Sequence, residues 1–222
     1  MSLNAKDIPF GGSNMVAEPL EAGTYPGRLV QVIDLGLQPQ QYLGEDKAPA
    51  YSIFTTYELV DEFLKDEDGN DIEDKPRWVS ENFALHNIKS EKATSTKRYN
   101  ALDPNNIYTG DWVGVLGAPV MVTLVQNPGK GKNTGKIYNK IVSTSAMRAK
   151  DAAKVAPLVN PTKVFDLDAP DVEVFNALPD WLKERITSNL EFKGSKLEKL
   201  LGGAAPSTSE PPLDIDDEES PF

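Results

Sequence analysis

The clearest alternation of apolar and polar residues lies at 51–60, where the sequence reads YSIFTTYELV. Successive side chains of a β-strand point to opposite faces, so this segment predicts a strand. One face of it consists of Tyr51, Ile53, Thr55, Tyr57 and Leu59. Segments rich in β-branched and aromatic residues predict four more strands, at Tyr25–Leu35, Arg77–His86, Pro119–Gln126 and Lys136–Met147. The connections are expected to be a loop at 38–49, an acidic turn at 61–74 and a flexible basic loop at 127–135.

Helical patterns occur between the third and fourth strands and again near the C-terminus. The helical segments expected are 90–102, 171–178, 180–190 and 195–201. Ser90 can cap the first of them, and Pro104 follows its end. Pro179 separates the next two helices. The helix at 180–190 carries an apolar stripe that predicts a packing surface, made of Trp181, Leu182, Ile186 and Leu190.

Five strands with one inserted helix predict a mainly β (α+β) protein. The pattern is typical of an OB-fold, a small, partly open barrel that binds oligonucleotides. A β-sandwich or another small barrel is the alternative. The expected organisation is an N-terminal arm (1–23), an OB-fold-like nucleic-acid-binding domain (24–150), a helical extension (151–201), and a flexible linker with a disordered acidic tail (202–222). The extension is expected to pack on the barrel or on the second subunit of a homodimer.

Charge is distributed unevenly along the chain. The net charge is −11, but residues 75–154 carry 13 basic and 5 acidic side chains, whereas residues 1–74 carry 4 basic and 15 acidic ones. A local positive surface attracts a polyanion whatever the total charge of the protein. The alternative is that acids and bases simply pair across the folded surface.

Composition argues against several classes of protein. The chain has no Cys and one His, His86, so disulfides, thiolate chemistry and an ordinary zinc site are not expected. It lacks a long apolar run and the apolar region of a secretory signal, so we expect a soluble, cytoplasmic protein without a membrane span. The acids of 61–74 do not follow the EF-hand order, and Gly129–Lys136 fails the P-loop pattern. We therefore expect no enzyme activity, no metal and no cofactor.

Basic and aromatic residues within the 75–154 block are candidates for binding a single nucleic-acid strand. Cationic side chains bind phosphates, and aromatic rings stack on bases. Lys136, Tyr138 and Lys140 share one face of the fifth strand, and Trp78 lies on the polar face of the third. The alternative for each is ordinary packing or solvation. The predicted nucleic-acid-binding residues are Trp78, Lys92, Lys97, Arg98, Tyr99, Lys130, Lys132, Lys136, Tyr138, Lys140, Arg148 and Lys150.

The last ten residues, LDIDDEESPF, combine a run of acids with a final phenylalanine. Such a segment cannot form a core, but an aromatic ring next to the terminal carboxylate suits an apolar pocket with a basic rim. Cutting at Ala204 is expected to tighten DNA binding, because the acids would otherwise compete for the basic block. The predicted partner-binding residues are Asp214, Asp216, Asp217, Glu218, Glu219, Pro221 and Phe222.

This tail resembles the C-terminal tip of bacterial single-stranded DNA-binding proteins, with Ser220 where an Ile usually precedes the Pro. The body resembles a tailed-phage single-stranded DNA-binding protein. The segments that carry this resemblance are Tyr25–Val30, Ser95–Tyr99, Val142–Arg148, Lys163–Leu167 and Leu178–Leu182. The resemblance implies a protein that coats single-stranded DNA during phage replication, recombination and repair, with little sequence preference. It also implies that the tail recruits replication and recombination proteins.

The residues alone leave two other functions open. A DNA mimic or inhibitor would present the acids of 1–74 to a host nucleic-acid enzyme, and gel shifts with single- and double-stranded oligonucleotides would distinguish it. A metal-dependent nuclease would cleave its substrate with magnesium, although no motif supports one.

Overall fold

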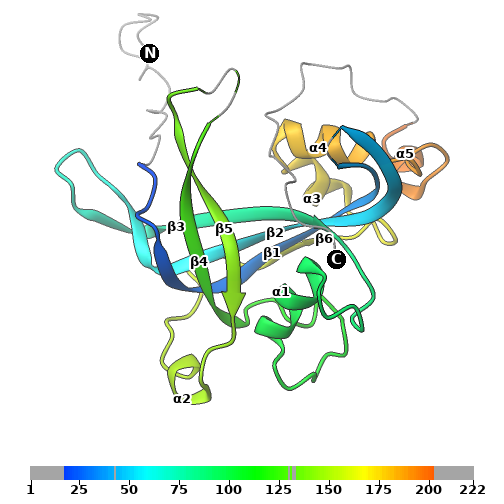
Figure 1. Cartoon of the computed structure of the whole chain (residues 1–222). Helices are drawn as coiled ribbons and strands as arrows, with labels where there is room; N and C mark the ends of the chain where they lie inside the picture. Colours follow the sequence, from blue (N-terminus) through cyan, green and yellow to red (C-terminus); the bar gives the residue numbers. More distant parts are fainter. Residues whose placement is uncertain (1–17, 43, 130, 132–133, 203–222) are drawn as a thin grey trace, which may run out of the picture.

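The computed structural model describes residues 18–42, 44–129, 131 and 134–202, and the protein it shows is mainly β (Figure 1). The predicted tail residues 214–222 therefore lie outside the described residues. The strands are β1 (Gly23–Tyr42), β2 (Glu45–Lys65), β3 (Asp71–Ala84), β4 (Pro119–Pro128), β5 (Ile137–Ser145) and β6 (Lys163–Phe165). The helices are α1 (Thr94–Leu102), α2 (Ala149–Ala152), α3 (Val172–Asn176), α4 (Asp180–Thr187) and α5 (Lys196–Leu200). All six strands belong to one sheet in the order β3-β2-β1-β4-β5, with β6 paired to β1.

Strand β1 organises this sheet because it has three partners. It pairs antiparallel with β2 over most of its length and with β4 at residues 23–28, and it pairs in parallel with β6 at residues 31–33. Irregularities in the β1–β2 register occur at three points, one of them between Asp34 and Gly36. Bulges of this kind bend a strand and increase its twist. The far half of β1 accordingly curls away from β4 and β5 with the start of β2 (Figure 1).

The middle of β2, residues 52–59, is buried on both faces. Ile53, Tyr57 and Leu59 belong to a core that also contains residues of β4, β5 and α1. On the opposite face, Phe54 packs in a second core with the C-terminal helices. Burial on both sides explains why the segment reads as an almost continuous series of β-branched and aromatic residues. The two cores hold the sheet between α1 on one side and α3–α5 on the other.

The C-terminal helices pack on β1 and β2 of the same chain. Phe175, Leu182 and Leu197 are buried in the core shared with Ile33 and Leu35 of β1. The sequence left open whether this extension covers its own sheet or a second subunit, and in the structure it covers its own sheet. This packing brings α4 beside the curled β1–β2 hairpin (Figure 1).

A glycine allows the close approach of α4 to β1. Gly36 has φ +73°, and a Cβ there would lie 2.7 Å from Cγ of Asn189. Just beyond α4, Asn189 is buried and donates from Nδ2 to the carbonyl of Ile186 at 2.6 Å, while the N–H of Leu190 donates to the carbonyl of Leu37. A larger residue at position 36 would be strained and would push this helix away from the sheet.

The structure corrects several predicted boundaries. The expected loop at 38–49 is the end of β1 and the start of β2, which form one long hairpin. The helix expected from Ser90 begins at Thr94, with Ala93 at its N-cap and no side-chain cap, so the prediction for Ser90 is wrong. The elements α2 and β6 were not predicted, because four-residue and three-residue elements carry too few positions for a periodic signal.

Candidate nucleic-acid interface

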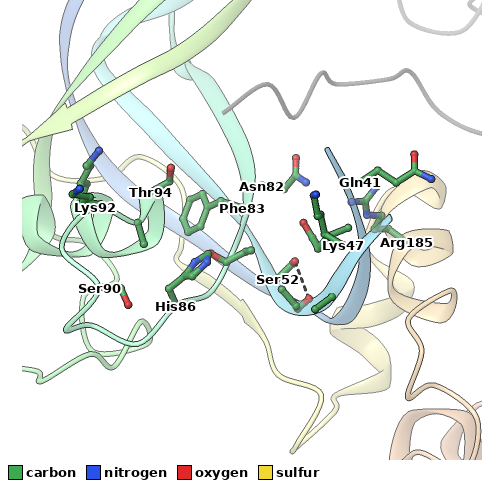
Figure 2. A pocket seen from close by; sticks show the side chains of 16 residues that line it. Gln41, Lys47, Ser52, Asn82, Phe83, His86, Ser90, Lys92, Thr94 and Arg185 are labelled. Carbon is green, nitrogen blue, oxygen red and sulfur yellow. Dashed lines mark hydrogen bonds between the residues drawn. The ribbon is translucent and has the colours of Figure 1, made fainter. Parts of the chain in front are cut away.

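A groove of about 560 Å³ lies between the β1–β2 hairpin and the segment that leads into α1. We call it the hairpin groove. Figure 2 shows Lys92 and Thr94 on one side of it, Lys47 and Arg185 on the other, and Asn82 between them. Its lining residues are Gln40, Gln41, Lys47, Ala48, Ala50, Ser52, Asn82, Phe83, Ala84, His86, Ser90, Lys92, Ala93, Thr94, Lys97 and Arg185.

A second groove of about 520 Å³ lies between α1 and the end of β5. We call it the β5 groove. Its lining residues are Thr94, Lys97, Arg98, Asn100, Ala101, Val142, Ser143, Thr144, Ser145 and Ala146. Thr94 and Lys97 line both grooves, so the first half of α1 forms the boundary between them.

The hairpin groove is basic although the chain as a whole is acidic. Among the residues that the structure describes, none that lines either groove is an Asp or a Glu. The cationic side chains Lys47, Lys92, Lys97 and Arg185 surround the hairpin groove, together with the single histidine of the chain. Positive charge collected in a concave surface raises the local concentration of an anionic ligand.

The cations of the hairpin groove come from three separate parts of the fold. Lys47 lies at the start of β2 and also forms an exposed ion pair with Glu45 at 3.1 Å. Lys97 is carried by α1, and Arg185 by α4. Gln38 of β1 donates from Nε2 to the carbonyl of Arg185 at 3.1 Å, which fixes this end of α4 against the hairpin. Docking of the C-terminal helices therefore adds Arg185 to a groove whose other lining residues come from the sheet and the α1 region.

The outer face of β2 and β3 continues from the hairpin groove. Asn82 is the cross-strand partner of Phe54, whose ring meets Trp181 of α4 edge to face at 5.3 Å between centroids. Trp181 remains 38% exposed. Because Trp181 and Arg185 are four residues apart, they lie on the same face of α4. An exposed indole and a cation thus stand together on α4, where Arg185 lines the groove and Trp181 lies beside it without lining it.

Trp78 stands further along β3 and is not among the residues that line the grooves. It is 44% exposed, as its predicted place on the polar face requires. Its indole Nε1 donates to Oε2 of Glu58, its cross-strand partner, at 3.0 Å. Glu58 is 1% exposed and also accepts from the backbone N–H of Val159 at 2.6 Å and from Nδ2 of Asn160 at 2.7 Å. The segment after α2 is thereby held across the outer face of the sheet.

The prediction that Tyr99 stacks on a base is wrong. Tyr99 is 2% exposed, and its ring packs edge to face against Trp112 at 5.4 Å. Its hydroxyl donates to Oδ2 of Asp103 at 3.3 Å. Burial would raise the pKa of Asp103, but the backbone N–H groups of Ile107 and Tyr108, together with the Tyr99 hydroxyl, hold this pKa below its ordinary value. Tyr99 therefore stabilises the turn after α1.

Arg98, which was predicted to bind phosphate, is 5% exposed and has a structural role. Its Nε donates to Oε1 of Glu81 at 2.7 Å, and its Nη2 donates to Oε2 of the same carboxylate at 3.0 Å. Nη2 also lies 3.5 Å from the carbonyl oxygen of Ile141. Glu81 belongs to β3 and Ile141 to β5, so Arg98 connects the two outer strands of the sheet from α1. The guanidinium is engaged inside the protein, which corrects the prediction.

The other predicted residues fall into separate groups. Lys92 and Lys97 are exposed and line the hairpin groove together. Lys136, Tyr138 and Lys140 lie at the far end of the β4–β5 hairpin, because Tyr138 pairs with Asn127 close to the loop. Lys130 and Lys132 lie outside the described residues. Arg148 forms an ion pair with Asp151, and Lys150 is exposed in α2. Of the predicted residues that the structure describes, Lys92 and Lys97 line the hairpin groove, and Lys97 and the ion-paired Arg98 line the β5 groove.

Three residues of the candidate interface were missed in the sequence. Lys47 lies in a segment that the sequence predicts to be a loop, and it is surrounded by the acids of the block 1–74. Trp181 was assigned to an apolar packing stripe, and Arg185 was assigned no role. The four-residue spacing of Trp181 and Arg185 could have marked a shared helix face, but nothing in the sequence says which element that face meets.

Within the part of the chain that the structure describes, no group of three or more His, Asp or Glu side chains is arranged to hold a metal ion. A separate finding concerns membranes: among the described residues, no helix is long and apolar enough to span one.

Comparisons of the chain with protein-family models, with curated proteins and with solved structures found no match.

Proposed function

We propose that this protein binds single-stranded DNA and coats it with little sequence preference. The observation that carries the proposal is the pair of adjoining grooves, lined by Lys47, Lys92, Lys97 and Arg185 and without an acid among the described lining residues, in a chain of net charge −11. Single-strand binders combine a positive groove with aromatic rings. Trp181 supplies such a ring beside Arg185.

We assign the fold to the OB class as part of the same proposal. In the strand order β3-β2-β1-β4-β5, β1 is paired with both β2 and β4, and the two outer strands β3 and β5 contact each other. Helix α1 contacts β3, β4 and β5. These contacts support a partly open five-stranded barrel with its helix beside the seam between β3 and β5. OB-folds bind oligonucleotides on strands 2 and 3 and the adjoining loops, and the hairpin groove takes residues from β2, β3 and the end of β1 as well as from the α1 region and α4.

The wider role follows from the resemblance and belongs to the proposal. The protein would act in phage DNA replication, recombination and repair in the host cytoplasm. Its acidic, Phe-terminated end would recruit replication and recombination proteins. No enzyme activity and no cofactor are needed for these functions.

Removing the groove cations is expected to weaken DNA binding about 10- to 100-fold at ~0.1 M salt. The variant combines Lys47→Ala, Lys97→Ala and Arg185→Ala, and fluorescence anisotropy with a labelled oligo(dT) measures its affinity. Each phosphate contact that is lost should also reduce the slope of log K against log salt by about 0.7, so the slope should flatten by roughly 2 in all.

The matched control combines Lys65→Ala, Lys193→Ala and Lys199→Ala. These lysines are exposed, none lines either groove, and their removal changes the net charge by the same amount. A loss of affinity in the control as large as that of the groove variant would reject the grooves as the binding site. If the unaltered protein binds neither single- nor double-stranded oligonucleotides, the DNA-binding proposal fails and the DNA mimic is favoured.

Ending the chain at Ala204 is expected to tighten oligonucleotide binding several-fold at low salt and to abolish capture of tail partners. The removed segment carries six acids and no base, so it competes with phosphates for the grooves. Full-length and truncated proteins are compared by anisotropy at two salt concentrations. Equal affinities at low salt would reject the competition. Partner capture is tested independently with Phe222→Ala, which keeps all the acids.

A further inference from the structure

The hairpin groove continues in two directions, and the two continuations differ in the residues that line or cross them. One runs along the outer face of β2 and β3 towards Trp78. The other crosses the first half of α1 at Lys97 and enters the β5 groove. The contacts along these two routes indicate which of them a bound strand follows.

The segment of residues 156–160 lies across the route towards Trp78. On the outer face of the sheet, the backbone N–H groups of Val159 and Asn160 bond to the Glu58 carboxylate, at 2.6 Å to Oε1 and 3.3 Å to Oε2. Arg28 holds the same segment at a point nearer to α2, because its Nε donates to the carbonyl of Ala156 at 2.7 Å. A buried carboxylate also lies on this route, and it repels phosphate.

The route over α1 is open and carries groups that suit a nucleic-acid backbone. Lys97 is exposed and faces both grooves. Beyond it the β5 groove offers the hydroxyls of Ser143 and Ser145 and the side-chain amide of Asn100. Strand β5 ends the described sheet and is paired only with β4, so its other edge is not hydrogen-bonded to another described strand. Hydroxyls, amides and backbone N–H groups are common donors to phosphate oxygens.

We propose that a bound single strand passes from the hairpin groove over Lys97 into the β5 groove, so that each molecule holds the strand on both sides of α1. This inference rests on the proposed DNA binding and adds the course of the strand. Lys97 and the serine hydroxyls can bond to the phosphates of any sequence, which agrees with binding of little sequence preference. Trp78 lies off this course.

Because the chain contains no cysteine, single cysteines allow a direct test of the course. Ser90→Cys in the hairpin groove, Ser143→Cys in the β5 groove and Asn176→Cys on α3 are each labelled with a thiol-specific photo-crosslinker in the full-length protein. All three positions are exposed, and Asn176 lines neither groove. Each labelled protein is first titrated with a 5′-labelled oligo(dT) of about 16 nucleotides, the upper end of the range for one OB-fold, and is then irradiated.

We expect crosslinks from positions 90 and 143 at least 10-fold above that from position 176. Mapping the adducts of the two proteins should place the crosslink from position 90 and the crosslink from position 143 at different mean distances from the 5′ end. Crosslinking from position 90 alone would overturn the proposed course while leaving the DNA-binding function intact. If the oligonucleotide binds to none of the labelled proteins and also not to the unlabelled one, the DNA-binding proposal itself fails.

A charge substitution gives an independent measurement on the unlabelled protein. Asn100→Glu places an acid in the β5 groove, and Asn176→Glu makes the same change on an exposed helix away from both grooves. We expect Asn100→Glu to weaken oligo(dT) binding about 5-fold or more relative to Asn176→Glu at ~0.15 M salt, where charges more than about 8 Å apart are largely screened. Equal affinities of the two variants would contradict a strand in the β5 groove.

Discussion

Arg98→Ala is expected to lower the free energy of unfolding by about 3–5 kcal/mol, the usual cost of removing one partner of a buried ion pair. The Glu81 carboxylate would lose both guanidinium donors in a largely buried position, and the carbonyl of Ile141 would lose its contact. Because Arg98 connects β3 to β5 from α1, the loss should loosen the seam between the two outer strands. Urea unfolding monitored by circular dichroism measures the change.

Lys97→Ala is the matched control, one residue earlier on α1. Lys97 is exposed, so its replacement should change the unfolding free energy by no more than about 0.5 kcal/mol. A double-mutant cycle with Glu81→Gln separates the pair energy from general damage, because the second substitution should cost much less once Arg98 is gone. If Arg98→Ala were as stable as Lys97→Ala, the structural role of Arg98 would be rejected and its assignment to phosphate would return.

Glu58→Ala is expected to cost about 3–4 kcal/mol, because several donors lose a buried, charged acceptor at once. The donors are the indole of Trp78, the N–H groups of Val159 and Asn160, and the side-chain amide of Asn160. The segment after α2 should then detach from the sheet, and hydrogen exchange at Val159 should accelerate. Trp78 would lose its fixed orientation.

Thr56→Val is the control for this substitution, since Thr56 lies on the same face of β2. It shares one neutral hydrogen bond with Ser80 at 3.0 Å, and its loss should cost about 1 kcal/mol. Hydrogen exchange at Val159 should stay slow in Thr56→Val. Fast exchange in both variants would mean that Glu58 does not hold the segment across the sheet.

Periodicity in the sequence located the strands better than it located their ends. The alternation at 51–60 predicted β2, but the structure extends that strand to Glu45–Lys65. Many of the additional residues are charged or small. Residues 45–50 are in a strand because they pair along a hairpin with β1, and residues 61–65 because they continue beside β3. Pairing partners are a property of the tertiary structure, so local preference underestimates such hairpins.

The candidate site was predicted less completely than the strands, and α1 shows why. Its sequence at 94–102, TSTKRYNAL, has small polar residues on its buried face, with Ser95 and Thr96 inside the protein. A helix with this pattern gives no apolar stripe that would tell which side faces the core. Lys97 points outwards whereas Arg98 and Tyr99 point inwards, and only the packing against β3 and β5 decides this.

The sequence by itself determined that the protein is mainly β, that its middle is basic and its ends acidic, and that an inserted helix lies between the third and fourth strands. These properties depend on composition and on the two-residue repeat of strands, which are local. Only the tertiary structure decided which cations share a groove. Lys47, Lys97 and Arg185 are separated by up to 138 positions in the chain, and they meet because the bent β1 brings its hairpin, α1 and α4 to one end of the sheet.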